Sequence, residues 1–266
     1  MCRLLGIKAN RPVDLTFSLM EAPDSLRVQS GGNRDGWGLA AWGGDGWCVS
    51  KRPVPAAADP GFREAAIQAE GSIIIGHVRY SSVGGRSLEN THPFRHGTWV
   101  FAHNGTLRGS DRLLPAVSPA LAGAVLGTTD SERFFFLALS RIEARAGGLG
   151  RGLALDLLLD ALRDAVDLAG HHCDVRGLNF LISDGDRLIA HRLGNTLYWL
   201  DRRSPSHDRV AWTSPRTRAL LESKALSGER TLLVASEPLT GEEEPWEEVP
   251  EGRFVVFTSN VKVRRA

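Results

Sequence analysis

The pattern of hydrophobic positions divides the chain into a strand-rich beginning, a helical middle and a strand-rich end. Short apolar or alternating runs, several of them rich in β-branched residues, predict the early strands. These strands cover residues 2–9, 37–42, 46–51, 72–78 and 98–102. Apolar residues spaced three or four positions apart predict two long helices over 130–145 and 151–169. Shorter helices are expected at 14–21 and 61–70, and the late strands at 177–183, 186–192, 196–201, 209–213, 229–235 and 253–258.

The order of these elements indicates the fold class. Strands are followed by two central helices and then by more strands, without the strand–helix alternation of a doubly wound parallel sheet. The pattern favours an α+β fold in which two mostly antiparallel sheets pack on each other, with helices outside. No repeat, linker or low-complexity segment divides the chain, so we expect residues 2–266 to form a single domain.

Composition and charge narrow the range of partners. The 266 residues are 42% hydrophobic and 24% charged, and the formal net charge is +1. Without a basic stripe, the sequence argues against nucleic acid and anionic membranes as partners. No apolar run reaches the roughly 18 residues of a spanning helix, and no signal peptide is visible. We therefore expect a cytoplasmic protein, with the short run Glu242-Glu243-Glu244 in a solvated loop.

The chain has three cysteines, and the first stands apart. Cys48, in an apolar stretch, is expected in the core, and Cys173 follows two histidines in His171-His172-Cys173. Adjacent side chains point in different directions, so this triplet is a poor metal site, and we expect no metal and no cofactor. Cys2 follows the initiator Met1 directly. If Met1 is removed, Cys2 carries both a thiol and an α-amine with a pKa near 8, which can act as its base.

On its position alone, Cys2 could be a coincidence of the second codon, but further motifs follow it in order. The segments are Met-Cys2-Arg-Leu-Leu-Gly6, Asn33-Arg34-Asp35-Gly36-Trp37-Gly38, Gly76-His77-Val78-Arg79-Tyr80-Ser81-Ser82, His103-Asn104-Gly105 and Thr129-Asp130-Ser131-Glu132. Together they resemble the class II glutamine amidotransferases, whose nucleophile is an N-terminal cysteine. Arg34 stands where the family often has proline. A later segment, Ala235-Ser236-Glu237-Pro238-Leu239, also looks like a loop of this group. The resemblance implies a four-layer αββα sandwich of the Ntn-hydrolase type.

The resemblance also implies an oxyanion hole at His103-Asn104-Gly105. Attack by Cys2 on an amide carbonyl creates an oxyanion, and one donor aimed at it contributes roughly 3–4 kcal/mol. Asn104 offers a side-chain amide and Gly105 a backbone N–H. The alternative interpretation is an ordinary type I′ hairpin turn at Asn-Gly.

A glutamine or γ-glutamyl substrate carries an α-carboxylate and an α-ammonium group. The resemblance assigns Arg79 to the carboxylate, which a guanidinium can bind through two hydrogen bonds, and Asp130 to the ammonium group. The alternatives are a structural ion pair for Arg79 and capping of the helix that starts here for Asp130. Backbone or hydroxyl groups of Ser81, Ser82 and Val83 are expected to complete the pocket.

Other motif residues are expected to support the site. Asp35 and Trp37 are interpreted as shaping the loop near Cys2. Because the α-amine serves as base, none of His77, His92 and His103 is needed for proton transfer. His77 and His103 are interpreted as buried, hydrogen-bonded supports.

The sequence most resembles the stand-alone subgroup of the family, which includes γ-glutamyl hydrolases, because no phosphate-binding loop or synthase module accompanies the motifs. Three hypotheses remain: a γ-glutamyl hydrolase that acts through a Cys2 thioester, a glutaminase subunit that supplies ammonia to a partner protein, and a non-catalytic binding protein on the same fold. The sequence does not identify the leaving group.

Overall fold

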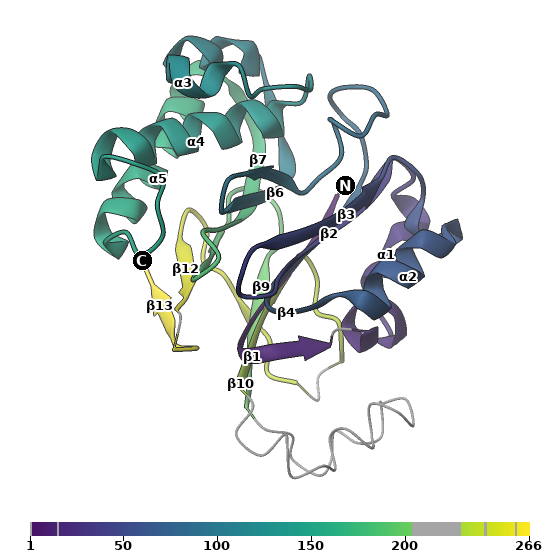
Figure 1. Ribbon diagram of the computed structural model, residues 1–266. Coiled ribbons are helices and arrows are strands. Elements are labelled where there is room, and N and C mark those ends of the chain that lie inside the picture. The colour runs from purple at the N-terminus through teal and green to yellow at the C-terminus, as the bar shows by residue number, and fades with distance from the viewer. Residues whose placement is uncertain (1, 15, 204–229, 242–243, 259) are drawn as a thin grey trace.

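Two antiparallel sheets form the centre of the protein, whose computed structural model describes residues 2–14, 16–203, 230–241, 244–258 and 260–266 (Figure 1). The seven-stranded sheet has the order β11 (Glu247–Glu248), β9 (Tyr198–Arg203), β10 (Arg230–Ala235), β1 (Arg3–Asp14), β4 (Glu70–Arg79), β2 (Gly36–Trp42) and β3 (Trp47–Arg52). The six-stranded sheet has the order β13 (Val263–Arg265), β12 (Phe254–Phe257), β8 (Leu188–His191), β7 (Asp174–Ser183), β6 (Trp99–Arg108) and β5 (Phe94–His96).

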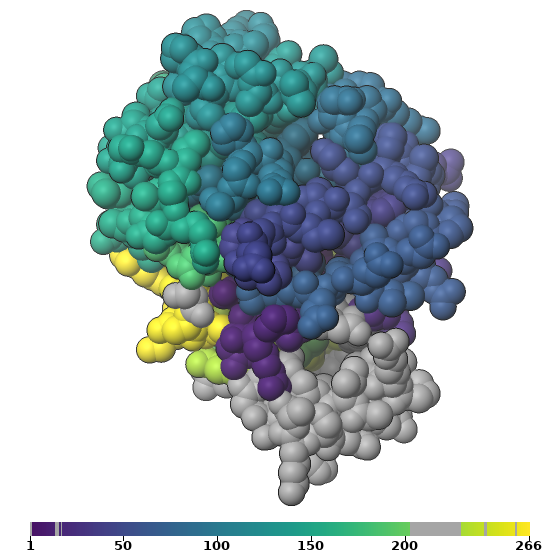
Figure 2. All heavy atoms as spheres, viewed as in Figure 1, coloured from purple at the N-terminus to yellow at the C-terminus, as the bar shows by residue number. Residues whose placement is uncertain are grey.

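Helices cover the outer face of each sheet. The seven-stranded sheet is covered by α1 (Leu26–Gln29) and α2 (Pro60–Gln68), and the six-stranded sheet by α4 (Asp130–Ala146) and α5 (Leu155–His172) (Figure 1). Short helical segments complete the connections: η1 (Phe17–Glu21), η2 (Ser30–Gly32), η3 (Ala56–Ala58), η4 (Ser110–Ala116) and α3 (Pro119–Ala122). In the space-filling view, the teal segments around α4 and α5 lie on one side and the blue segments around α2 on the other (Figure 2).

Alternating strand residues build the layers. In β1, Leu4 points into the core between the sheets, whereas Leu5 packs in the core beneath α1 and α2. In β6, Val100 points between the sheets and Phe101 toward α4 and α5. Because successive strand side chains face opposite sides, each sheet is buried on both faces. The expected α+β fold of two antiparallel sheets with outer helices is confirmed.

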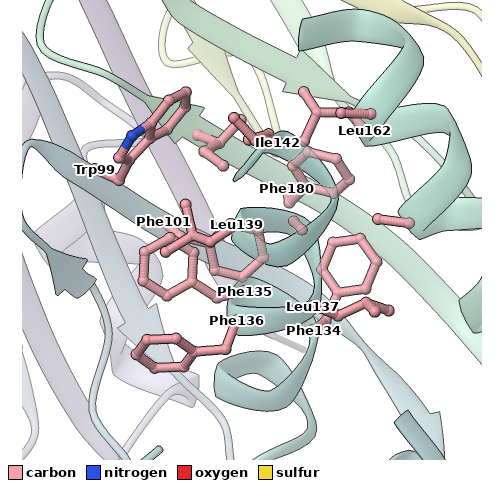
Figure 3. Packing of buried hydrophobic residues seen from close by; sticks show 14 of the residues in the cluster. Trp99, Phe101, Phe134, Phe135, Phe136, Leu137, Leu139, Ile142, Leu162 and Phe180 are labelled. Atoms are coloured by element: carbon pink, nitrogen blue, oxygen red, sulfur yellow. The ribbon is translucent and has the colours of Figure 1, made fainter. Parts of the chain in front are cut away.

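The core beneath α4 is built from aromatic rings. Phe101 of β6 stacks on Phe135 with ring centroids 5.3 Å apart, and Phe134 lies 5.4 Å from Phe180 of β7 (Figure 3). All four side chains are fully buried. Aromatic side chains bury about 150–250 Å² each, so this cluster fixes the helix against the sheet and hence the position of the N-terminus of α4.

Most predicted elements are present, and the differences lie in short elements and in the first strand. β1 extends to Asp14, so the helix expected at 14–21 is reduced to η1 at Phe17–Glu21, and the short helices α1, α3 and η4 were not predicted. The two long helices and the hairpin of β2 and β3 agree with the prediction to within a few residues. The short strands β5, β11 and β13 were not predicted, because two or three residues leave no periodic pattern. The strand expected at 209–213 lies outside the described residues.

Two expectations about single residues were wrong. Cys48 is exposed because Trp47 beside it points into the core between the sheets, and strand alternation turns Cys48 to the other face of the edge strand β3. Glu244 is buried and pairs with Arg202, at 2.8 Å and 2.5 Å, rather than lying in solvent. Glu242 and Glu243 lie outside the described residues. None of the helices in the described ranges is both long and apolar enough to cross a membrane.

Candidate active site

Cys2 lies immediately before β1, where the backbone is held from two sides. On one side, Ser236 accepts a hydrogen bond from Leu4 N at 2.9 Å through its hydroxyl and donates its own N–H to Leu4 O at 3.0 Å. On the other side, β1 pairs with β4, with Arg3 opposite Val78. The late segment 235–239 therefore anchors the start of the chain, a role that its sequence alone does not reveal.

The Cys2 sulfur contacts the backbone of Tyr80. Tyr80 N donates to Sγ at 3.2 Å, and Sγ lies 3.3 Å from Tyr80 O, which can accept from the thiol. Burial raises the pKa of the Cys2 thiol, while the Tyr80 N–H and the positive charge of Arg79 act to lower it. The net shift is upward, so the thiol needs a base to become a nucleophile.

Arg3 holds the backbone of Cys2. Its Nη1 donates to Cys2 O at 3.3 Å, and its Nη2 forms an ion pair with Glu237 at 2.6 Å. The guanidinium thus connects Cys2 to the 235–239 segment. No sequence signal beyond the terminal motif points to this link, because 234 positions separate Arg3 from Glu237.

The loop after β4 is ordered by Arg79 and Asp35. Asp35 accepts from Ser81 N at 2.8 Å and from Arg86 Nε at 2.6 Å. Burial acts to raise the pKa of Asp35, but these two hydrogen bonds and the Arg86 charge outweigh it and lower the pKa. Asp35 therefore shapes the loop that holds Tyr80 against Cys2, as the sequence led us to expect. Trp37 instead packs on Phe62 of α2, with ring centroids 5.3 Å apart.

Arg79 is buried and donates to loop carbonyls. Nη2 donates to Val83 O at 2.9 Å and Gly84 O at 3.1 Å, and Nη1 donates to Gly85 O at 3.1 Å. Within the described residues, no carboxylate forms a salt bridge with Arg79, so the alternative of a structural ion pair does not hold there. Burial lowers the pKa of Arg79, opposed by the charges of Cys2, Asp35 and Asp130. A guanidinium has five N–H donors, which leaves capacity for a substrate carboxylate.

Asn104 and Gly105 lie inside β6 rather than in a hairpin turn. They pair with Asn179 and Leu178 of β7, and the register shifts directly after Gly105. A Cβ at Gly105 would lie 1.9 Å from Gly177 O, so only glycine allows the two strands to approach here. Asn195 Nδ2 donates a hydrogen bond to Asn104 O at 3.2 Å. This rules out the turn interpretation and places both residues at a strand irregularity, as is common beside active sites.

Hydroxyl groups connect the loop after β4 to β6. Ser82 Oγ lies 2.7 Å from Thr106 Oγ1, and Ser81 donates its hydroxyl to Gly84 O at 2.7 Å. The Ser82 contact brings the candidate binding loop next to the His103-Asn104-Gly105 segment. Thr106 was not singled out from the sequence, because a lone threonine after a motif gives no signal.

Asp130 is the first residue of α4 and is buried. Thr129, not Asp130, caps the helix by accepting from Glu132 N at 3.2 Å. The Asp130 carboxylate is therefore free of capping, and its Oδ2 accepts from Leu107 N at 2.7 Å. Its charge acts on both Cys2 and Arg79, so the three groups lie within electrostatic reach of one another.

Replacing Thr129 with alanine should destabilise the protein by about 1 kcal/mol, because the N–H of Glu132 loses its capping acceptor. Thermal or urea unfolding measures the change, and Thr129→Ser, which keeps the hydroxyl, serves as the matched control. An equal loss of unfolding free energy in Thr129→Ala and Thr129→Ser would contradict the capping role.

Three histidines form a buried group beneath the site. His77 Nε2 donates to His103 O at 3.1 Å, and the ring centroids of His77 and His92 lie 4.1 Å apart. His103 Nδ1 lies 2.9 Å from Ser131 Oγ. Burial lowers the pKa of His77 to about 3 and that of His92 well below its usual value. The interpretation of His77 and His103 as buried, hydrogen-bonded supports is confirmed.

The chain is similar to proteins of a known family. The family model of the class II glutamine amidotransferases matches residues 1–264. YafJ of Escherichia coli (strain K12), provisionally named a glutamine amidotransferase, is 29% identical over 273 residues, covering 99% of this chain and 100% of YafJ. The γ-glutamyl-hercynylcysteine sulfoxide hydrolase of Mycobacterium tuberculosis (strain ATCC 25618 / H37Rv) is 29% identical over 246 residues, covering 84% of this chain and 92% of the hydrolase.

Solved structures agree with this relationship. A protein from Pseudomonas aeruginosa, described as a predicted glutamine amidotransferase, superposes with a TM-score of 0.62 at 25% identity over 98% of both chains. The glutamine phosphoribosylpyrophosphate amidotransferase of B. subtilis superposes with a TM-score of 0.63 at 17% identity, over 99% of this chain and 48% of its own, and supports the fold alone. The family model spans nearly the whole chain, and this protein therefore belongs to the class II glutamine amidotransferases.

Proposed function

We propose that the protein hydrolyses the γ-amide of glutamine or of a γ-glutamyl conjugate, with Cys2 as nucleophile and its α-amine as base after removal of Met1. The observation that carries this proposal is the position of the Cys2 sulfur, which contacts Tyr80 and is influenced by the charges of both Arg79 and Asp130. A substrate with a carboxylate and an ammonium group on one carbon matches this pair of opposite charges.

The reaction proceeds in two steps of acyl transfer. The α-amine takes the thiol proton, and the sulfur attacks the amide carbon to form a tetrahedral oxyanion beside Asn104 and the N–H of Gly105. The C–N bond then breaks, and the leaving nitrogen takes the proton from the α-ammonium group. A water molecule, deprotonated by the α-amine, attacks the thioester and releases glutamate with the thiol restored.

Two measurements test the proposal. Intact-protein mass spectrometry should show loss of Met1, because a retained methionine would leave Cys2 without a free α-amine. Incubation with glutamine and a panel of γ-glutamyl amides should release glutamate. A protein that retains Met1 while turning over, or one that releases glutamate from no compound of the panel, would overturn the proposal.

Asp130→Asn should raise the KM for glutamine by about tenfold to a hundredfold, because a charged hydrogen bond to the substrate ammonium is lost. Asparagine can still accept from Leu107 N, so the fold should persist and kcat should change less. Asp160→Asn, at an exposed carboxylate on α5, is the control.

Steady-state kinetics with glutamine and with its analogue lacking the α-amino group measures this effect. Asp130→Asn should discriminate between the two compounds far less than the original protein does. Equal discrimination by both proteins would show that Asp130 does not bind the ammonium group.

A further inference from the structure

A chain of hydrogen-bonding groups reaches Asp130 from inside the protein. His103 Nε2 lies 3.4 Å from Gly177 O, and His103 Nδ1 lies 2.9 Å from Ser131 Oγ. Ser131 Oγ in turn lies 3.4 Å from Asp130 Oδ1. The His103 and Ser131 side chains are buried, and the proposed mechanism uses neither of them.

The donor and acceptor roles along this chain are fixed by Gly177. A carbonyl oxygen only accepts, so Nε2 of His103 carries the hydrogen in this contact. In a neutral imidazole, Nδ1 is then an acceptor, and Ser131 must donate its single hydroxyl hydrogen to it. The same hydrogen cannot also go to Asp130. Oδ1 of Asp130 is then left without the Ser131 hydrogen, while Oδ2 accepts from Leu107 N at 2.7 Å.

We propose that His103 is a positioning residue that turns the Ser131 hydroxyl away from Asp130 and so keeps Oδ1 available for the substrate ammonium group. This inference rests on the proposed function, because it assigns a task to the carboxylate that binds the ammonium. Ser131 acts through Asp130, and His103 acts through Ser131. Neither side chain needs to touch the substrate.

The surroundings favour the neutral form of His103. Burial lowers the pKa of His103, opposed by the charge of Asp130 on α4 and by the Gly177 carbonyl on β7. From β4, His77 donates to the His103 carbonyl, and the pKa of His77 is itself lowered to about 3. His92, from the loop before β5, is also held neutral by burial. Around neutral pH the hydroxyl therefore points to His103.

A pair of substitutions tests the inference through KM. In His103→Phe the Ser131 hydroxyl loses its acceptor and turns to Asp130, where it competes with the substrate, so the KM for glutamine should rise about five- to tenfold. Adding Ser131→Ala removes the competing hydrogen, and the double variant should return to within about twofold of the original KM. Ser131→Ala alone should change KM by less than about twofold near neutral pH.

A purely structural role predicts the opposite pattern. The double variant would then be more impaired than either single variant, and this outcome would overturn the inference. Nitrogen chemical shifts of the His103 ring provide a readout that needs neither activity nor substitution. They should show hydrogen on Nε2 and a bare Nδ1 at pH 7, and the other tautomer or an imidazolium would refute the assignment. Absence of glutamate release by the original protein would instead count against the proposed function alone.

Discussion

Cys2→Ala should abolish glutamate release, lowering kcat by about four to six orders of magnitude, because the sulfur is the only group proposed to form the acyl intermediate. The fold should survive, since the side chain is small and its sulfur forms hydrogen bonds with the backbone of Tyr80. Cys2→Ser keeps a nucleophile of similar size, but the hydroxyl is far less acidic than a thiol, so its activity should also be very low.

The other two thiols provide matched controls. Cys48 is exposed on β3 and Cys173 is partly buried at the end of α5. Replacing either with alanine should leave turnover within about twofold, as expected for a substitution away from the site. An electrophilic glutamine analogue should label the original protein once, and of the three cysteine-to-alanine variants only Cys2→Ala should lose the label. Labelling that persists in this variant, or turnover that survives it, would reject Cys2 as the nucleophile.

The pH dependence of the same assay tests the base. The α-amine can accept the thiol proton only when it is itself unprotonated, so the rate depends on the unprotonated fraction of the α-amine. For an amine with a pKa near 8, kcat/KM should increase about tenfold per pH unit below that value and level off above it. A rate that stays constant from pH 6 to 8 would exclude the α-amine as base.

The sequence predicted the layers of the fold because strands buried on both faces appear as short, continuous apolar runs. Leu4 and Leu5, or Val100 and Phe101, point into two different cores, so both members of each pair are apolar. For residues on the edge strand of a sheet, the sequence pattern predicts burial less well. Cys48 was placed in the core because its neighbours are apolar, yet the face on which it lies depends on what covers the edge of the sheet.

The candidate site was accessible from the sequence only through its motifs. Cys2, Arg79 and Asp130 were selected by resemblance, and the structure brings them within electrostatic reach of one another. Contacts that depend on register were not predictable. The Tyr80 backbone meets Cys2 because Arg3 pairs with Val78 across two strands far apart in the chain, and no local pattern encodes that pairing. The same applies to the hydrogen bonds of Ser236 with Leu4.

Gly105→Ala should impair both stability and catalysis, because the space beside this residue is occupied by backbone. A Cβ would lie 1.9 Å from Gly177 O and 2.4 Å from Gly177 C, so one of two paired strands must move. Overpacking of this kind should cost about 3 kcal/mol, a drop in Tm of roughly 6–12 °C for a chain of this size. The strand movement also displaces the proposed oxyanion donors, and kcat should fall by about 10²–10³.

Two companion variants separate the steric effect from the catalytic one. Gly123→Ala, where a Cβ would meet nothing within 4 Å, should leave Tm and kcat nearly unchanged. Asn104→Ala removes only the side-chain donor and should lower kcat by about 10²–10³ with a smaller drop in Tm than Gly105→Ala. Thermal unfolding and steady-state kinetics below the lowest Tm measure both effects. If Gly105→Ala kept the original kcat despite a lower Tm, the strand irregularity would be structural only, and the oxyanion would have to be stabilised by other donors.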